Sequence, residues 1–460
     1  MIHKLRLAAT PALLLLCLLL GGASAAGIWA NMALQLIACG FLFWAVIAQR
    51  SAAMPTPGRQ LLVLAGLMIA LIAVQLIPLP PSVWTALPGR QQVAEGFRML
   101  DQPLPWLPIS LSPARTISSG LWLLPALAVL LGILRLGAFR ASWCAWVLAI
   151  VTITSVGLGA LQMVGGEQSP WYIYDITNYG VTVGFFSNAN HMATLLVATV
   201  PFLAALYVNA RARGRSVQRN SGMFVVLAGT LIIVFVGLAA NRSVAGMGLS
   251  VPVLAGSLLM ILSRRRRLPG WSAALIALLL AASVVAAFSA PFGSGLGGQE
   301  AAASTETRRT SFTRTTQAAR DFLPLGSGVG SYYEVYRTYE PPETIGRFYM
   351  NHVHGDYIEV ALETGIPGLV LVVLFLLWWA RRVIATWRSQ EPDYFARAAT
   401  IASAAILAHS LVDYPLRTAA ISAVFAMCCA LMAEPRAKAQ RKRRNEDEDA
   451  KPAPRHLSAD

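Results

Sequence analysis

Long apolar stretches separated by short polar segments make up most of this chain. A transmembrane α-helix needs about 20 mostly apolar residues, and twelve stretches reach or approach that length. They cover 8–26, 28–48, 60–78, 116–137, 142–164, 190–209, 221–240, 244–262, 270–290, 364–380, 396–412 and 418–433. The last two are the weakest, because they are short and close together. The pattern predicts an all-α polytopic membrane protein with about twelve transmembrane helices.

Composition excludes other classes of protein. Apolar residues make up 56% of the 460 residues and charged residues 13%, whereas an average soluble domain is about 25% charged. These values exclude a soluble globular domain, a disordered chain and a disulfide scaffold. The five cysteines lie in apolar stretches without zinc-type spacing, so we expect them to pack as small apolar side chains.

Basic residues gather in every second connecting segment. Together these segments hold 26 of the 37 Lys and Arg residues. They are 2–7, 49–59, 135–141, 210–220, 263–269, 381–397 and 434–460. Cytoplasmic loops of membrane proteins carry an excess of Lys and Arg, so both termini are predicted to be cytoplasmic. The net charge of +15 then encodes topology, and no nucleic-acid partner is expected.

The remaining connecting segments are expected on the outer side of the membrane. The predicted organisation is nine transmembrane helices over 1–290 with an outer loop at 79–115, a mostly helical outer loop domain over 291–363, three further helices over 364–433, and a disordered cytoplasmic tail over 434–460. The first stretch has an alternative interpretation, because Lys4, a leucine run and Ala23-Ser24-Ala25 resemble a cleavable signal peptide. An uncleaved first helix is favoured, since the next apolar stretch follows at once.

Ionisable residues are nearly absent from the predicted transmembrane interiors. His409 is the main exception, and Glu363 lies at the edge of a stretch. Charge-coupled transporters usually place such groups near the middle of the membrane, so their absence counts against a transporter of that kind. Polar residues gather instead in the outer segments.

Arg242 is the first outer candidate. It stands between Asn241 and Ser243, where two apolar stretches are joined by almost nothing, so it is expected at the outer membrane interface. The alternative is an arginine that only reaches towards the lipid headgroups.

A second candidate segment contains Arg308, Arg309, Arg314 and Arg320, followed by Gly326-Ser327-Gly328-Val329-Gly330. Glycines let the backbone turn and approach a ligand closely, but no strand precedes them, so a dinucleotide-binding fold is excluded. The arginines could also form a solvated helix face.

The third candidate segment runs from Asn351 through His352, His354, Asp356 and Tyr357. A His-x-His pair can bind a metal, but no convincing third ligand is present, and no metal or other cofactor is expected. A histidine near neutral pH suits general-base catalysis.

Together these segments resemble the O-antigen ligase and polymerase family of bacterial membrane enzymes, including its exopolysaccharide-associated members. The most specific similarity is His354-Gly355, then nine residues, then Gly365-Ile366-Pro367-Gly368. The family usually has an amide or hydroxyl residue where this chain has Gly355. Weaker similarities lie at Asn241-Arg242, at Arg308 with the glycine segment, at Gln75-Leu76-Ile77-Pro78, at Gly184 to His191 and at His409 to Asp413.

The resemblance implies a multi-span, GT-C-like glycosyltransferase fold in the bacterial inner membrane, with its active site facing the periplasm. It also implies metal-independent, inverting transfer of glycan from undecaprenyl pyrophosphate to a glycan or lipid A-core acceptor. His354 is the expected general base, and Arg242 and Arg308 are expected to hold the pyrophosphate, with Arg309 as an alternative to Arg308. Further substrate-binding residues are expected at His352, Asp356, Tyr357, Asn188, Asn190, Gly328 and Gly330.

Two other functions compete with this interpretation. A lipid-linked glycan flippase would need a polar cavity reachable from both sides of the membrane, and a co-polymerase or scaffold would need no site. A cluster of Arg242, Arg308 and His354 on one side would favour the enzyme. The sequence does not separate a ligase from a polymerase, because the two differ in the acceptor.

Overall fold

The computed structural model describes residues 2–24, 28–48, 54–212, 217–263, 271–289, 299–344 and 351–433. Within these residues the elements are helices, together with one isolated bridge between Leu79 and Leu107. Every apolar stretch predicted from the sequence falls on a helix or on a pair of consecutive helices. Among the described residues, eight helical segments are long and apolar enough to cross a membrane. The all-α polytopic class is therefore confirmed, whereas the span count of about twelve is not.

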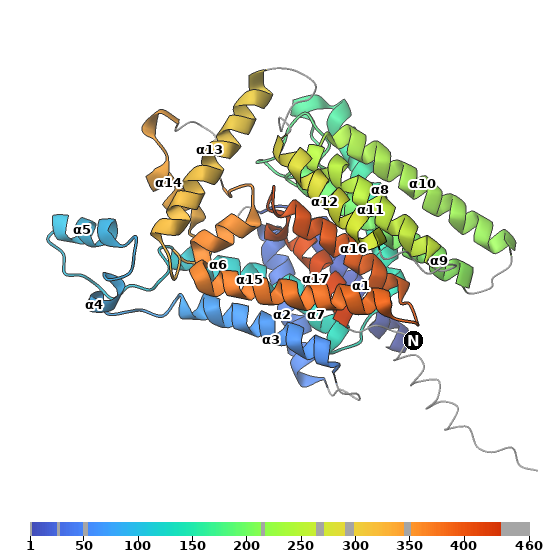
Figure 1. Cartoon of the computed structure of the whole chain (residues 1–460), viewed down its shortest axis with the longest axis horizontal. Helices are drawn as coiled ribbons and strands as arrows, with labels where there is room; N and C mark the ends of the chain where they lie inside the picture. The colour runs from blue at the N-terminus through green and yellow to red at the C-terminus, as the bar shows by residue number, and fades with distance from the viewer. Residues whose placement is uncertain are drawn as a thin grey trace, which may run out of the picture.

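The helices divide into an apolar bundle and shorter connecting elements (Figure 1). The bundle contains α1 (Ile2–Leu20), α2 (Trp29–Ile47), α3 (Thr56–Val74), α6 (Pro113–Trp122), α7 (Leu124–Leu134), α8 (Ala141–Val164), α9 (Ala189–Ala212), α10 (Val217–Asn241), α11 (Val244–Leu262), α12 (Trp271–Ser289), α15 (Asp356–Arg388), α16 (Tyr394–His409) and α17 (Ala419–Ala433). The connecting elements are α4 (Pro81–Trp84), α5 (Gln91–Met99), η1 (Gly166–Gln168), α13 (Gln299–Asp321), α14 (Tyr332–Tyr339), η2 (Pro342–Thr344) and η3 (Pro415–Arg417).

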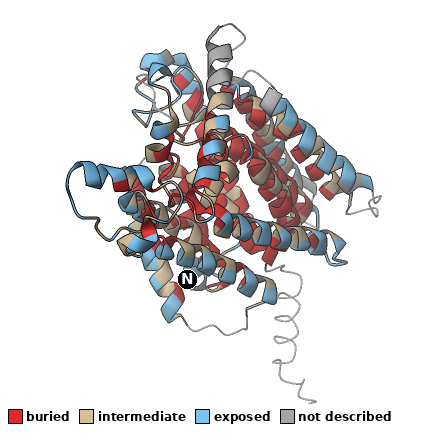
Figure 2. Ribbon diagram, turned by 60° about the vertical axis from the view of Figure 1, so that its left-hand side comes forward, coloured by how far each residue is buried: buried red, intermediate tan, exposed pale blue. Residues whose placement is uncertain are grey.

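Helix α9 forms the centre of the bundle. Its most apolar window is 94% buried, compared with 17% for α3, which lies at the periphery. Helices α8, α10, α11 and α16 pack around α9, and α16 meets it with a run of alanines. Small residues let helix backbones approach closely where lipid offers no competing hydrophobic gain. Figure 2 shows buried residues inside the bundle and exposed residues on its outer helices.

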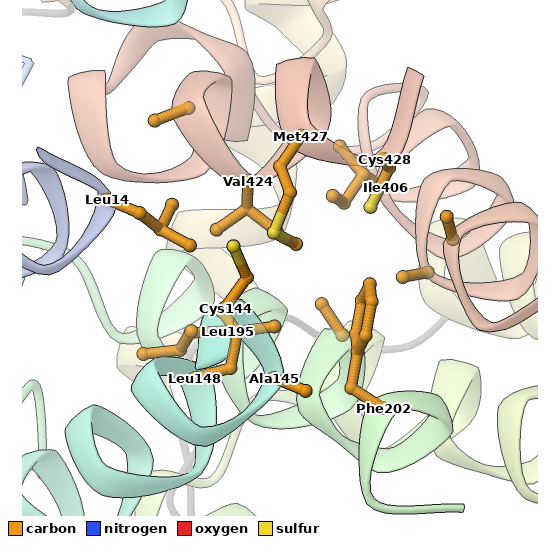
Figure 3. Packing of buried hydrophobic residues seen from close by; sticks show 14 of the residues in the cluster. Leu14, Cys144, Ala145, Leu148, Leu195, Phe202, Ile406, Val424, Met427 and Cys428 are labelled. Atoms are coloured by element: carbon orange, nitrogen blue, oxygen red, sulfur yellow. The ribbon is translucent and has the colours of Figure 1, made fainter. Parts of the chain in front are cut away.

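The interior of the bundle is packed with apolar side chains. Figure 3 shows Leu14 of α1, Cys144 of α8, Phe202 of α9 and Met427 of α17 converging in one cluster. Four of the cysteines are buried free thiols, and Cys39 is exposed on α2. Close packing of this kind holds the helix ends in fixed positions.

Basic side chains at one end of the bundle bind carbonyl groups at helix ends. Arg382 donates two hydrogen bonds to the Met432 carbonyl at 2.8 and 3.0 Å, and Arg6 donates to Leu136 at 2.7 Å. Carbonyls in the last turn of a helix lack intrahelical partners. These residues belong to the segments predicted to be cytoplasmic, so the same charges that predict topology also cap helices.

The opposite end, called here the site end, brings together the segments predicted to lie outside. The Ala420 amide donates to Gly21 at 3.0 Å, the Ser110 amide to Gln75 at 3.0 Å, and the Asp356 amide to Ser410 at 2.9 Å. Helices α13 and α14 also lie at this end (Figure 1).

Helix α15 begins at Asp356, before the predicted transmembrane start at 364. The polar first turns were expected to lie in the loop, but they contain acidic residues, which favour a helix N-terminus. The helix bends at Gly365, where φ is 57° and ψ is −147°. A Cβ at this position would overlap the Pro324 carbonyl, so the bend requires glycine.

Candidate functional site

Two histidine–carboxylate pairs lie side by side at the site end. The Nδ1 of His352 is 2.7 Å from Glu359 Oε1, and the Nδ1 of His354 is 3.1 Å from Asp413 Oδ1. Both carboxylate side chains are fully buried, and both histidines are partly exposed. Each imidazole is therefore held from behind by a buried carboxylate while its other edge reaches the surface of the site.

Tyr414 lies between the histidines and fixes their rings. Its ring centroid is 4.8 Å from that of His352, 5.2 Å from that of His354 and 4.9 Å from that of the buried His191. Its backbone amide donates a 2.9 Å hydrogen bond to Asp413. The loop between α16 and α17 thus supplies both the carboxylate and the aromatic ring that orient His354.

Asp413 is the charged partner of His354. Burial alone would raise the pKa of its carboxyl, but the hydrogen bond with His354 and the neighbouring histidines hold the pKa well below its ordinary value. An ionised Asp413 accepts a hydrogen bond from Nδ1–H of neutral His354. The basic lone pair of His354 is then on Nε2, because the two ring nitrogens take opposite roles in a neutral imidazole.

Arg417 of η3 faces three carboxylates on α15. It lies 3.0 Å from Glu363 Oε2, 3.4 Å from Glu359 Oε1 and 3.6 Å from Asp356 Oδ1. Burial lowers the pKa of a guanidinium, but the three carboxylates raise the pKa of Arg417 above its ordinary value. The carboxylates recur at intervals of three and four residues, which places them on one face of the helix.

Backbone amides of the glycine segment, residues 326–330, hold α15 in place. The amide of Gly330 donates to Glu363 Oε1 at 2.8 Å, and the amide of Gly328 donates to the Glu363 carbonyl at 2.9 Å. Both glycines have positive φ, 105° at Gly328 and 82° at Gly330. Their conformation therefore brings backbone amides to Glu363, and through Glu363 to Arg417.

Arg90 ties the outer loop at 79–115 to the same glycine segment. It donates to the Gly326 carbonyl at 3.2 Å and to the Ile109 carbonyl, and its guanidinium lies over the Phe322 ring. Burial lowers the pKa of Arg90 to about 10. The sequence analysis did not select Arg90, because an arginine in a polar loop carries no sign of burial.

Arg242 occupies the turn between α10 and α11, at the site end. It is exposed and has a positive φ of 59°. Its neighbours fix the turn: Asn241 donates to the Ala189 carbonyl at 2.9 Å, and Ser243 donates to Asn190 Oδ1 at 2.7 Å.

Asn188 and Asn190 support this turn. Asn188 Oδ1 accepts a hydrogen bond from the Asn190 amide at 2.8 Å, and Asn190 accepts the one from Ser243. Ser243 also caps α11 through the Gly246 amide at 3.1 Å. The two asparagines expected to bind substrate thus position the backbone that carries Arg242.

Arg308 and Arg309 fall within α13, and their side chains lie outside the described residues. Phe312, one turn further along α13, packs against Gly355, where a Cβ would lie 2.8 Å from the ring. This contact explains why the chain has glycine where the family has an amide or hydroxyl residue. It also brings this part of the α13 backbone close to the segment that contains His352 and His354.

The expected residues His352, Asp356 and Tyr357 line one cavity of about 430 Å³, together with Glu363 and Arg417. Among the described residues there is no group of three or more His, Cys, Asp or Glu side chains arranged to hold a metal ion. The titratable side chains at the site are the two histidines and their carboxylate partners, and Arg417 is a cation that faces the carboxylates of α15.

Sequence reasoning missed Arg417, Tyr414 and the pairing of Asp413 with His354. Their contacts cross more than fifty positions of the chain, which a local pattern does not reveal. The available signal was the charged loop 413–417 between two short apolar stretches.

A comparison with protein families finds a match over part of the chain. The model described as O-antigen ligase matches residues 229–373, which include Arg242, α13, the glycine segment and both site histidines. Asp413 and Arg417 lie beyond it. No curated protein matches the chain. The match covers the segments that carry the motifs, and over these residues the chain is similar to the O-antigen ligase family.

Proposed function

We propose that this protein is a glycosyltransferase that transfers or polymerises glycan from undecaprenyl pyrophosphate at the periplasmic face of the bacterial inner membrane. The observation that carries the proposal is the His354–Asp413 pair at 3.1 Å, at the end of the bundle that also carries Arg242. Transfer from a diphosphate donor requires both a general base and a cation that binds phosphate.

In this proposal His354 is the general base. The acceptor hydroxyl attacks the anomeric carbon of the donor sugar, the bond to the pyrophosphate breaks, and the hydroxyl proton passes to Nε2 of His354. Asp413 stabilises the imidazolium that forms. Attack on the side opposite the leaving group inverts the sugar, and no metal takes part.

Arg242 is proposed to bind the pyrophosphate, with Arg308 or Arg309 as the second cation. A guanidinium presents paired donors that match phosphate oxygens, and it stabilises the charge that develops as pyrophosphate leaves. The exposure of Arg242 at the site end supports this role. Asn188 and Asn190 keep the Arg242 turn in place.

The competing function is a lipid-linked glycan flippase. A flippase needs a polar route reachable from both sides of the membrane, whereas the described core around α9 is closely packed with apolar side chains (Figure 3). The candidate site residues described by side chain lie at one end of the bundle. These observations favour the enzyme.

The test is transfer in vitro with purified protein and a lipid-linked glycan donor. The enzyme should extend or attach the glycan and release undecaprenyl pyrophosphate, and His354→Ala should abolish release in a protein that still folds. Movement of intact donor across vesicles without release would instead support the flippase.

Surface polysaccharide from a deletion strain separates the two enzyme types. Accumulation of lipid-linked single repeats would identify a polymerase. Accumulation of full-length lipid-linked chains would identify a ligase.

A further inference from the structure

His191 is a histidine in the first turn of α9 to which the proposed function gives no role. Its side chain is fully buried, and neither nitrogen of its ring has a hydrogen-bond partner among the described residues. Burying a polar group without a partner is costly, and an apolar ring of the same shape would avoid that cost. An imidazole at this position therefore calls for a reason other than packing.

The surroundings of His191 connect it to the proposed base. Its ring lies nearly perpendicular to that of Tyr414, at 83° and with 4.9 Å between the centroids. The Tyr414 ring also lies 5.2 Å from that of His354. Asp413, the residue before Tyr414, is the buried carboxylate that pairs with His354. His191 therefore packs against the same short loop that holds the base.

Asp413 has an acceptor that such a histidine could use. Its Oδ1 receives the hydrogen bonds of His354 and of the Tyr414 amide, whereas its buried Oδ2 has no hydrogen-bond partner in the described part of the chain. Burial alone would raise the pKa of Asp413, but His354, then His191 and His409, hold the pKa well below its ordinary value. His191 is thus near enough to stabilise the negative charge of Asp413, and a neutral imidazole carries one N–H donor.

The other titratable and charged groups around this loop already have partners. His409 of α16 is 2.8 Å from the Thr194 hydroxyl, and His352 is 2.7 Å from Glu359. Arg417 faces the carboxylates of α15, which are Asp356, Glu359 and Glu363. Of the four histidines around Asp413 and Tyr414, His191 is therefore the one whose hydrogen-bonding capacity is unused within the described residues.

We propose that His191 is a positioning residue that acts on His354 through Asp413, by donating a hydrogen bond to Asp413 Oδ2 in the working site. This bond would use both buried groups, hold the carboxylate in place and share its negative charge. A shared carboxylate attracts the proton of His354 less, so His354 stays neutral down to a lower pH. The catalytic meaning of this effect rests on the proposed function of His354, whereas the interaction of His191 with Asp413 does not.

His191→Phe tests the inference, because phenylalanine keeps a ring against Tyr414 and removes both nitrogens. Diethyl pyrocarbonate acylates neutral imidazole, and His354 is partly exposed, so the pH dependence of its labelling gives the pH midpoint of its protonation. Tandem mass spectrometry of the full chain distinguishes His354 from His352. In His191→Phe the midpoint should rise by roughly 0.5–1 pH unit, the size expected for one lost hydrogen bond.

Transfer should respond in the same direction. The acid limb of the pH profile should move to higher pH in His191→Phe, and kcat near neutral pH should fall while the KM for the lipid-linked donor stays the same. In an Asp413→Asn background, His191→Phe should shift the midpoint no further, because the charge that His191 shares is absent. This lack of additivity is the mark of two residues that act on each other.

Two kinds of variant separate this role from a structural one. His191→Asn and His191→Gln offer an amide N–H in place of one or the other ring nitrogen, and one of them should restore the midpoint of the wild type. Thr10→Val is the matched control, because the fully buried Thr10 hydroxyl also lacks a partner among the described residues. Thr10 lies at the opposite end of the bundle, where its amide donates to Ala138. Thr10→Val and His191→Phe should both keep or raise the unfolding temperature, but only His191→Phe should move the midpoint.

Three results would overturn the inference. They are an unchanged or lowered midpoint of His354 in His191→Phe, a shift of the same size in the Asp413→Asn background, and no recovery in either amide variant. A raised midpoint in a protein whose transfer does not depend on His354 would reject the proposed function alone. Transfer that depends on His354, together with an unshifted midpoint in His191→Phe, would reject the role of His191 alone.

Discussion

Asp413 determines how His354 is oriented, so its charge can be tested separately from the base itself. Asp413→Asn keeps the shape but removes the ionised acceptor that holds Nδ1–H. Transfer should fall by about 10²–10⁴-fold, the range of a general-base contribution. Activity of the wild type should decline on the acid side as His354 becomes protonated, because an imidazolium cannot accept a proton.

The direction in which the pH profile of Asp413→Asn shifts distinguishes loss of the Asp413 charge from general damage to the fold. A neighbouring negative charge favours the protonated histidine, so in Asp413→Asn the acid limb should move to lower pH while the maximum rate falls. The pH dependence of transfer measures both effects. His352→Ala is the comparison, and it should retain more activity than His354→Ala. An unchanged acid limb in Asp413→Asn, or an active His354→Ala beside an inactive His352→Ala, would show that the base is elsewhere.

The turn that carries Arg242 is held by the neighbours of this residue, because the side chains of Asn241 and Ser243 make hydrogen bonds to the segment before α9 and to its first turn. Arg242→Ala should therefore leave folding intact and cost about 2.7–4 kcal/mol of transition-state stabilisation, by analogy with a lost oxyanion donor. Arg242→Lys should recover little, because a point charge does not replace a paired donor. Measurements of the transfer rate and of donor affinity test the predictions for both variants. Full activity in a folded Arg242→Ala protein would refute the assignment.

At the level of single residues, spacing in the sequence located candidates but not their partners. His354 stood out through its distance from Gly365 and Gly368, and Arg242 through its position between two apolar stretches. Asp413 could not be matched to His354, because that pairing depends on how segments 59 residues apart meet. The glycine segment was expected to approach a ligand, yet the Gly328 and Gly330 amides donate to Glu363.

At the level of elements, the bend in α15 sets the direction of the site. Gly365→Ala should lower the unfolding temperature and impair transfer, because it forces an alanine to a φ of 57° and into the Pro324 carbonyl. With ψ at −147° this backbone conformation is occupied almost only by glycine, and holding another residue in it costs on the order of 1–3 kcal/mol. Gly40→Ala is the matched control: a Cβ there meets nothing within 4 Å, and helix propensity predicts a gain of up to about 1 kcal/mol. Equal unfolding temperatures for the two variants would contradict this account.

Element boundaries were predictable where apolar composition decided them. The helix α11 begins and ends at the predicted residues, Val244–Leu262, because Ser243 caps its start. The start of α15 was not predictable from apolar composition, since its first turns carry Asp356, Glu359 and Glu363. These buried charges are balanced by Arg417, which comes from the segment between α16 and α17, and by His352, which directly precedes α15.

For the whole molecule, the central test is on which side of the membrane the site end lies. The alternation of 26 basic residues among the connecting segments predicts that this end faces the periplasm. The test introduces Glu343→Cys into a cysteine-free background. Because Glu343 is exposed at the site end, this cysteine should react with an impermeant thiol reagent in intact spheroplasts. Ser389→Cys is the matched control: Ser389 is exposed between α15 and α16 at the opposite end, and it should react only after the membrane is permeabilised. Labelling of Ser389→Cys before Glu343→Cys would invert the topology and place the histidines, with any glycan they act on, in the cytoplasm.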